Sequence, residues 1–241
     1  MSIADKLMEI ADKIPQIYNS GFQKGMKEAE GAGDTTEAYN QGVKDGKQAE
    51  YDALWDSLQG NGTEYLNYGY MFSAKEIWTQ ENIEKVKYKN LKCNYFSVVF
   101  SGNTSITDLS AFSFETEKGA YEEYRKSTLS ATFNGCTNLK KCMHINCDMV
   151  YEFTNAFNNC TSLEELPLTG VIIRGGLNLQ WSTKLNKESI TSVINCLSSG
   201  ANGLTVTLSL TAVNNAFEGG RDGTEWQTLI ATKPNWTIAY A

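Results

Sequence analysis

Two stretches of the sequence, "ATFNGCTNLKKC" (131–142) and "NAFNNCTSLEELPL" (155–168), carry the same frame, Phe-x-x-Cys-Thr-x-Leu. Four residues of the first stretch recur in the second, each 24 positions later: Phe133, Cys136, Thr137 and Leu139 become Phe157, Cys160, Thr161 and Leu163. Recurrence at a fixed period of about 20 to 50 residues is typical of repeat architectures. The pattern therefore predicts that one structural unit follows another along this part of the chain.

Two less regular copies of the frame flank this pair. The upstream copy, in "VVFSGNTSITDL" (98–109), begins 33 residues before the first Phe, and the charged insertion "ETEKGAYEEYRK" (115–126) accounts for the extra length. The downstream copy, in "LNLQWSTKL" (177–185), begins 22 residues after the second Phe. The residues in frame are Phe100, Asn103, Thr104 and Ile106 upstream, and Leu179, Ser182, Thr183 and Leu185 downstream.

A repeat of this length predicts one coil of a solenoid, whose coils stack because a single coil cannot bury its apolar face. At a tight corner, the Asn, Cys or Ser of successive coils would lie one above another and bond the backbone of the bend. Leucine-rich repeats accept Asn or Cys at this kind of position. The Thr residues would add a second ladder of hydroxyl groups. Cys136 and Cys160 are then small, semi-buried ladder residues, and we expect them to be reduced.

About the first 60 residues differ from the rest because they carry helical periodicity. Their aliphatic residues are spaced 4, 3, 4 and 3 positions apart, which is the seam of a coiled coil. These residues are Ile3, Leu7, Ile10, Ile14 and Ile17. Pro15 interrupts the helix, so that we expect a kink or a restart there. We predict that the seam is an oligomer interface, with packing against the chain's own second helix as the alternative.

A short repeat, Tyr-Asn-x-Gly-x-x-x-Gly, occurs in "YNSGFQKG" (18–25) and again in "YNQGVKDG" (39–46), where a second helix is expected. Glycines four positions apart lie on one helical face and let another backbone approach closely. Each also weakens a helix by about 1 kcal/mol. Both interpretations stay open: close packing in an oligomer, and a frayed helix.

The last 55 residues have the mixed pattern of a cap that shields the end of a stack. In "KESITSVINCLSS" (187–199), four apolar residues share one helical face: Ile190, Val193, Ile194 and Leu197. "GLTVTLSL" (203–210) alternates apolar residues through Leu210 and predicts a strand. Two short helices and a final strand are predicted after it, in "TAVNNAF" (211–217), "TEWQTLIATK" (224–233) and "NWTIAY" (235–240).

Composition narrows the function of the 241-residue chain. Its formal charge is −7 and its pI about 4.9, without a basic block, which disfavours binding to the phosphates of nucleic acids. No stretch approaches the roughly 18 apolar residues of a membrane span, and the N-terminus lacks the apolar core of a secretory signal. We therefore expect free, buried thiols. The six cysteines are Cys93, Cys136, Cys142, Cys147, Cys160 and Cys196.

Candidate metal-binding and nucleophilic residues are few. His144, the only histidine, lies between Cys142 and Cys147, and this Cys-x-His-x-x-Cys cluster offers three ligands to zinc. A coil segment with alternating burial, including Met143 and Ile145, explains the same residues. We therefore expect neither a metal site nor a Ser-His-Asp or Cys-His catalytic site.

Carboxylates and aromatic residues are the remaining candidates. Adjacent glutamates, at Glu122–Glu123 and Glu164–Glu165, are more typical of a solvated face than of the spaced carboxylate pair of a glycosidase. The chain holds 12 Tyr, 10 Phe and 5 Trp, which suit carbohydrate or protein recognition where they are exposed. Most Tyr rings are expected to be half-buried across coils, so that the sequence names neither a catalytic residue nor a binding residue.

The repeat frame resembles the BspA-like leucine-rich repeats of bacteria. Longer segments resemble tail-associated proteins encoded by phages and prophages of Gram-positive and gut bacteria. They are "SIADKLMEIADKIPQIY" (2–18), "YNQGVKDGKQAEYDALWDSLQ" (39–59) and an ending that runs from "STKLNKESITSVINCLSS" (182–199) through "LTVTLSL" (204–210) to "KPNWTIAY" (233–240). The resemblance covers most of the chain and transfers no catalytic residue. It implies a virion component with an N-terminal helical attachment segment and a solenoid displayed outward.

These observations predict an α+β fold in three parts. An N-terminal helical attachment or oligomerisation segment (1–62) precedes a short, irregular BspA-like leucine-rich-repeat solenoid (63–186), and an α/β cap (187–241) follows. The expected function is a structural component of a phage tail or baseplate, of the tail-fibre or receptor-binding type, that displays the repeats for recognition of the host surface. The alternatives are an adhesin-like leucine-rich-repeat protein of a bacterial surface and a glycan-cleaving tail enzyme.

The expected partners follow from the same resemblance. The N-terminal helices would bind other tail or baseplate proteins, and the repeats would bind a glycan or protein of the host-cell surface. A homotrimer is expected because tail tips have threefold symmetry. We expect the chain in the virion tail, assembled in the host cytoplasm, without a cofactor, nucleic acid or membrane insertion.

Overall fold

The computed structural model describes residues 66–67, 72–73, 78–86, 89–115, 127–174, 176–200 and 203–241. Contacts divide the chain into two compact units, Met1–Glu64 with Val86–Tyr88, and Tyr65–Lys85 with Lys89–Ala241. The helices and strands described below belong to the second unit. The predicted oligomer seam, both glycine motifs and most of the charged insertion lie outside the described residues.

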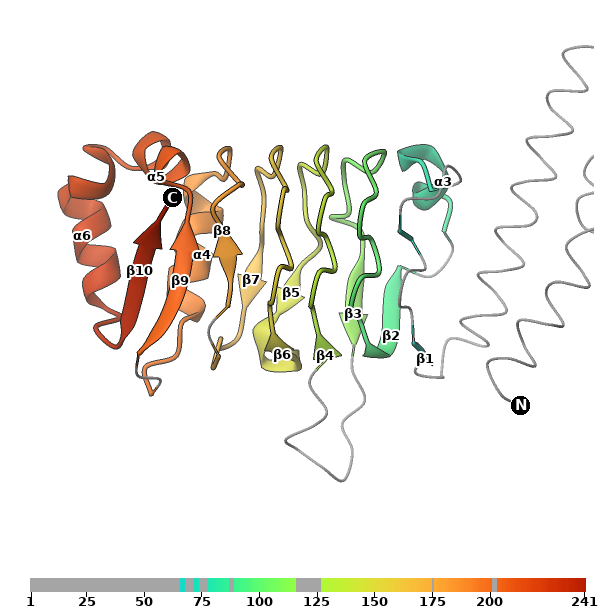
Figure 1. Cartoon of the computed structure of the whole chain (residues 1–241), viewed down its shortest axis with the longest axis horizontal. Coiled ribbons are helices and arrows are strands. Elements are labelled where there is room, and N and C mark those ends of the chain that lie inside the picture. Colours follow the sequence, from blue (N-terminus) through green and yellow to red (C-terminus); the bar gives the residue numbers. More distant parts are fainter. Residues whose placement is uncertain are drawn as a thin grey trace, which may run out of the picture. The chain divides into compact units, whose positions relative to one another are not determined.

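Short elements follow one another through the first part of this unit. They are β1 (Leu66–Asn67), α3 (Gln80–Glu84), β2 (Asn90–Tyr95), β3 (Ser113–Glu115), β4 (Ser127–Thr128), β5 (Ile145–Asn146), the 3-10 helix η2 (Cys147–Met149), β6 (Val150–Glu152), β7 (Leu168–Thr169) and β8 (Asn178–Leu179). The strand pairs β1–β2, β2–β3, β4–β6 and β5–β7 are all parallel. Figure 1 shows the corresponding turns of the chain one beside the next, and we call them the stack.

Three turns of the stack bend sharply around the Phe of the repeat frame. In three successive corners, the residues two before and two after this Phe have left-handed backbone, with φ between 51° and 76°. The pairs are Val98 and Gly102, Ala131 and Gly135, and Asn155 and Asn159. Left-handed residues reverse the chain direction over a short distance, which explains why glycine and asparagine occur at four of these six positions.

Backbone hydrogen bonds join each corner to the next. The N–H groups of Val98, Phe100 and Gly102 donate to the carbonyl oxygens of Ser130, Thr132 and Asn134, over 3.0, 2.9 and 2.7 Å. The N–H groups of Ala131, Phe133 and Gly135 donate in the same way to Thr154, Ala156 and Asn158, over 2.9, 2.9 and 2.8 Å. These backbone N–H and carbonyl groups of the corners are thereby hydrogen-bonded without water. Backbone groups beside buried side chains need such partners because water does not reach them.

A column of phenylalanine rings runs through the corners. The ring centroids of Phe72 and Phe100, of Phe100 and Phe133, and of Phe133 and Phe157 lie 5.1, 5.6 and 5.2 Å apart. The rings are within 12° of parallel and fully buried. Such pairs contribute about 0.5 to 1.5 kcal/mol each beyond their burial. The column reveals a copy of the frame that the sequence analysis missed, with Phe72 and Trp78 in the places of the frame Phe and Leu.

The small polar residues of the frame form the predicted ladder. The thiols of Cys136 and Cys160 each donate to the carbonyl oxygen of the Phe in the preceding corner, Phe100 and Phe133, over 3.1 and 3.0 Å. Asn103 reaches the carbonyl of Phe72 in the same way, over 3.1 Å. The prediction that these side chains bond the backbone is therefore confirmed for three copies.

One detail of that ladder was wrong, and the Thr contacts are only partly as expected. The hydroxyl of Ser182 is buried without a hydrogen-bond partner, because an oxygen lies closer to Cβ than a sulfur does and reaches less far. Between the Thr residues of two successive copies, the structure records a contact that uses one hydroxyl and one backbone carbonyl. Thr161 donates instead to the backbone carbonyl of Thr137, over 3.3 Å.

The rest of the unit is the cap, with both helices and strands. It holds α4 (Lys187–Cys196), β9 (Leu204–Leu208), α5 (Leu210–Ala216), the 3-10 helix η3 (Gly220–Asp222), α6 (Thr224–Ala231) and β10 (Trp236–Tyr240). A parallel sheet of order β10–β9–β8 joins the cap to the last turn of the stack (Figure 1). None of the described helices is both long and apolar enough to cross a membrane.

The helices and strands of the cap agree with the sequence periodicity, with one correction. Leu210 was expected to continue a strand, but it is the first residue of α5. Ser209 ends the strand and caps the helix, because its hydroxyl accepts a hydrogen bond from the N–H of Ala212. The described residues thus form a mixed helix-and-strand fold, whereas the assignment to BspA-like leucine-rich repeats stays a prediction.

Candidate functional site

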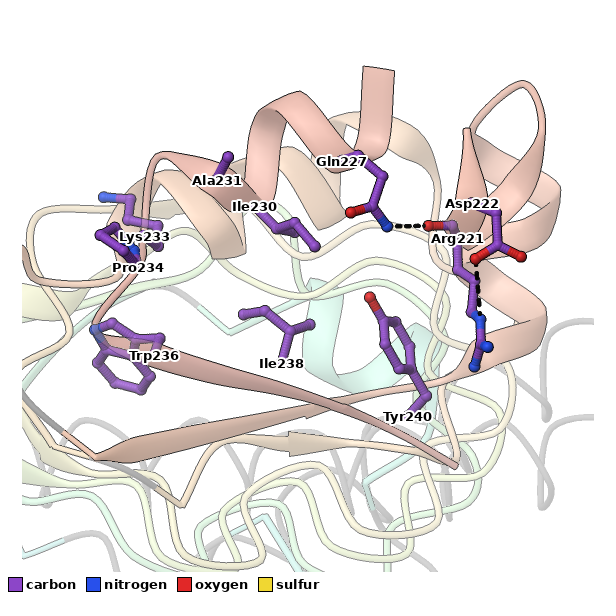
Figure 2. A pocket seen from close by; sticks show the side chains of 10 residues that line it. All are labelled: Arg221, Asp222, Gln227, Ile230, Ala231, Lys233, Pro234, Trp236, Ile238 and Tyr240. Atoms are coloured by element: carbon purple, nitrogen blue, oxygen red, sulfur yellow. Dashed lines mark hydrogen bonds and ion pairs between the residues drawn. The ribbon is translucent and has the colours of Figure 1, made fainter. Parts of the chain in front are cut away.

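A groove of about 510 Å³ lies between α6 and β10 in the cap. Its volume falls within the range of about 300 to 1,000 Å³ that is usual for small-molecule sites. Figure 2 shows its side chains, with α6 on one side and β10 on the other. The groove has an apolar floor, a polar end formed by η3 and an opposite end formed by Lys233 and Pro234.

The apolar floor comes from both elements. Ile238 and Tyr240 lie two positions apart on β10, so that they share one face of the strand, and Figure 2 shows both pointing toward α6. Ile230 of α6 points down to meet them. All three side chains are only half-buried. The floor is therefore an accessible apolar surface rather than part of the closed core.

Tyr240 is held in place by Trp226 of α6. Its hydroxyl accepts a hydrogen bond from Nε1 of Trp226 over 2.8 Å, and the two rings meet edge to face with centroids 6.4 Å apart. Trp226 is itself fully buried and lies 5.0 Å from the ring of Phe217. A ring fixed in this way loses little conformational freedom when a ligand contacts it.

The polar end of the groove is built on a tight glycine turn. Gly219 and Gly220 have φ of 74° and 60°, and a Cβ on Gly220 would lie only 2.5 Å from Oδ1 of Asn214. That same oxygen accepts a hydrogen bond from the N–H of Arg221 over 3.0 Å. The turn thereby fixes the position of Arg221, which explains the two adjacent glycines in "EGGRDG" (218–223).

Three polar side chains meet at this end. The guanidinium carbon of Arg221 lies over the ring of Tyr240, 5.9 Å from its centroid, and Nε pairs with Asp222 over 3.5 Å. The side-chain amide of Gln227 donates to the carbonyl oxygen of Arg221 over 2.6 Å. Arginine, aspartate and glutamine together offer hydrogen-bond donors, an acceptor carboxylate and an amide oxygen.

The opposite end of the groove is anchored to the C-terminal end of α4. Lys233 donates to the carbonyl oxygens of Asn195 and Leu197, over 2.9 and 2.5 Å. Nε1 of Trp236 donates to the carbonyl oxygen of Ser198 over 2.9 Å. The ammonium group of Lys233 therefore joins the loop between α6 and β10 to the C-terminal end of α4.

A second hollow, of about 460 Å³, lies on the turns beside α4. Nε2 of His144 and the hydroxyl of Thr169 are 2.9 Å apart there, and Glu165 pairs with Lys141 over 3.1 Å. The hydrogen bond to Glu165 and its charge raise the pKa of Lys141. Both charged partners are about half exposed, so that this pair contributes little to stability.

The structure separates the residues that could have bound zinc. Cys142 and Cys147 are buried, whereas His144 is exposed. Within the described ranges, no group of three or more His, Cys, Asp or Glu side chains is placed to hold a metal ion. Burial also follows a different pattern from the predicted alternation, since Cys142 and Met143 are both buried and the alternation starts only at Met143.

The five cysteines whose burial is described are buried, free thiols: Cys136, Cys142, Cys147, Cys160 and Cys196. Burial raises the pKa of Cys136 to about 12 and also raises the pKa values of Cys142 and Cys160, because the thiolate loses its hydration. A hydrogen bond from Cys147 lowers the pKa of Cys196. Thiols with raised pKa values are poor nucleophiles, as expected for ladder residues that fill space.

Sequence reasoning did not find the groove. The turn-like composition of "EGGRDG" (218–223) does not indicate a ligand site, and "NWTIAY" was predicted only as a strand. The alternation of Trp236, Ile238 and Tyr240 on one strand face is the signal in the sequence that points to an aromatic surface. Glu164 and Glu165 are half-buried on the turns, and the predicted oligomer residues and Glu122–Glu123 lie outside the described residues.

Comparisons with models of protein families, with curated proteins and with solved structures found no match to this chain. The resemblance to phage tail-associated proteins therefore stays a prediction that rests on the sequence segments themselves.

Proposed function

We propose that this chain is a structural component of a phage tail or baseplate that displays its second unit for recognition of the host-cell surface. The observation that supports the proposal most directly is the stack with its cap. Successive turns are joined through backbone hydrogen bonds and a continuous column of rings, and the cap carries an open groove. A rigid array with an accessible site at one end suits display.

The stack suits display because its described turns follow one another in a regular order. In a stacked array each turn contacts only its neighbours, and buried side chains lock every contact. The frame residues Phe133, Cys136 and Phe157 are each at most 1% exposed. Such an array holds the groove of the cap at a fixed distance and orientation relative to the first turn of the stack. This arrangement favours attachment of a large particle to a cell. The N-terminal segment would join the chain to other tail proteins and to its own copies.

The location of the protein, in phage particles or on the bacterial envelope, tests this proposal. Particles released after induction of the phage or prophage that encodes the chain are purified on a density gradient and analysed by mass spectrometry. We expect the chain to co-purify with tails. An antibody raised against the chain should label the tail tip in electron micrographs. Recovery of the chain on the bacterial envelope, and not in particles, would instead support the adhesin hypothesis and overturn the proposal.

A second measurement addresses recognition. Full-length protein, labelled with a fluorophore, is mixed with intact cells of strains that the phage infects and of strains that it does not infect. Binding restricted to sensitive strains supports the proposal, and equal binding to both contradicts it. Release of soluble sugars from the cell envelopes during incubation would point to the glycan-cleaving alternative.

A further inference from the structure

We propose that the groove between α6 and β10 binds a neutral pyranose unit of a surface carbohydrate. This inference rests on the proposed function and names the site at which recognition would occur. It is carried by the combination of an accessible apolar floor, one fixed aromatic ring and three converging polar side chains. Neither the sequence analysis nor the comparisons assigned a ligand to these residues.

The floor matches the apolar face of a sugar ring. A pyranose presents C–H groups on one face and hydroxyl groups around its edge. Ile230, Ile238 and Tyr240 offer a half-buried surface of similar kind, in which the tyrosine presents an apolar ring with a polar tip. Because Trp226 already engages the hydroxyl of Tyr240, the ring does not need to reorient to receive a ligand.

The polar end matches the hydroxyl groups at the edge of the sugar. Each sugar hydroxyl both donates and accepts hydrogen bonds. Arg221 supplies only donors, Asp222 supplies only acceptors, and Gln227 supplies both. The side chains of Arg221 and Asp222 are 51% and 84% exposed, so that both can be reached by a ligand. Two neighbouring hydroxyl groups could therefore contact one donor and one acceptor at once.

The charge balance favours a neutral sugar over a phosphate or an acidic sugar. The positive charge of Arg221 is offset by Asp222 beside it. The other cation that lines the groove, Lys233, has its ammonium group on two backbone carbonyl oxygens. An anion would gain little from the lysine and would lie close to the aspartate, whose repulsion opposes binding.

Saturation-transfer NMR on the full chain tests this site with four probes: glucose, galactose, mannose and N-acetylglucosamine, each at millimolar concentration. At least one of them should receive saturation from the protein. The variants Arg221→Ala and Gln227→Ala each remove a polar group of the groove and should weaken the affinity about tenfold, the effect of one lost hydrogen bond at about 1.4 kcal/mol. Both residues are exposed, so that the variants are expected to fold.

The chain offers a matched control. Arg174 is also exposed and also lies over a tyrosine, 4.0 Å from the ring centroid of Tyr151, but it is not part of the groove. Arg174→Ala should bind the sugar as the unaltered protein does. Equal loss of binding in Arg174→Ala and Arg221→Ala would show a general effect of arginine removal and would overturn the inference.

The remaining outcomes separate this inference from the proposed function. If no probe receives saturation while labelled protein still binds sensitive cells, the pyranose site is wrong and recognition lies elsewhere, for example on a surface protein of the host. If a probe binds through the groove but the chain is absent from phage particles, the site stands and the tail function fails. Binding of all four sugars unaffected by both groove variants would likewise overturn the groove as the site.

Discussion

Val98, Ala131 and Asn155 occupy the same place in three successive corners, and their φ values are 55°, 51° and 54°. The left-handed conformation costs about 1 to 2 kcal/mol for most residues, and asparagine tolerates it best after glycine. A β-branched valine is the least suited of the three. The backbone of the corner is therefore imposed by the stack, since Val98 itself does not favour it.

We predict that Val98→Asn raises the free energy of unfolding by about 1 kcal/mol, because it relieves this conformational cost at a half-exposed position. Urea unfolding followed by circular dichroism would measure it. The neighbouring Val99 is fully buried and has no positive φ, so that Val99→Asn should instead destabilise the protein. An unchanged or lower urea midpoint for Val98→Asn would contradict the prediction.

The buried thiol of Cys136 makes stability depend on pH. Burial raises its pKa from 9.0 to about 12 in the folded chain, while the unfolded thiol keeps its ordinary value. Between these values the unfolded state loses the proton first, so that the folding stability contributed by this group is complete below pH 9 and declines as the pH rises toward 12. The decline is about 1.4 kcal/mol per pH unit.

The comparison with Cys136→Ala isolates this effect from other groups that titrate at high pH. We predict that the difference in unfolding free energy between the two proteins is constant from pH 6 to 8. Above pH 9 it should shrink by about 1.4 kcal/mol for each pH unit. Urea titrations at pH 7, 9, 10 and 11 would show it. A difference that stays constant up to pH 11 would mean that the thiol is not buried in the ladder.

At the residue level, the sequence predicted the ladder but not its first copy. Cys136 and Cys160 each follow the frame Phe by three positions and directly precede a Thr, so that the recurrence is visible without a structure. The copy at Phe72 has Lys75 and Glu76 where the others have a small polar residue and Thr. Only Phe72 and Trp78 remain in frame, and two apolar residues six positions apart occur too often by chance to indicate a repeat.

At the scale of elements, α4 is tied to the stack through two hydrogen bonds of one side chain. The hydroxyl of Ser189 accepts a hydrogen bond from the N–H of Leu166 over 2.8 Å and donates to the carbonyl oxygen of Glu164 over 3.4 Å. Ser189 is 5% exposed. The helix therefore satisfies the buried N–H of Leu166, whereas the carbonyl oxygen of Glu164 also accepts a hydrogen bond from the N–H of Asn186 over 2.9 Å.

We predict that Ser189→Ala lowers the free energy of unfolding by about 1 to 3 kcal/mol, since it leaves the N–H of Leu166 buried and unpaired. Thermal or urea unfolding would measure the loss. Thr191 lies two residues further along α4 and is only partly buried, so that Thr191→Ala should change stability by less than about 0.5 kcal/mol. Equal effects of the two substitutions would show that the contact with Leu166 has no special role.

The sequence predicted the longer elements because their periodicity is internal. The apolar face of α4 and the alternation in β9 and β10 can be recognised in each segment alone. Strands such as β5 and β7, with two residues each, exist only through pairing with the next turn. The groove escaped prediction for the same reason, because Arg221, Gln227 and Tyr240 come from three elements that the fold alone brings together.

At the scale of the whole molecule, the two units raise the question of which one assembles the chain. The second unit, Tyr65–Lys85 with Lys89–Ala241, encloses its own buried core, including the ring column. A unit with a closed core does not need a partner subunit to fold. If the protein is an oligomer, the predicted seam of Ile3, Leu7 and Ile10 is then the candidate for the interface.

We therefore predict that the full chain is a trimer in light scattering, and that a truncated chain beginning at Tyr65 is a folded monomer. Leu7→Asp with Ile10→Asp should also yield monomers, because charges in an apolar seam oppose its burial. Ala4→Asp with Ala11→Asp adds the same charge off the seam and should leave the trimer intact. A trimeric truncated chain would place the interface in the second unit. A full chain that is monomeric would mean that the seam packs within one chain, and would favour the adhesin hypothesis over the tail.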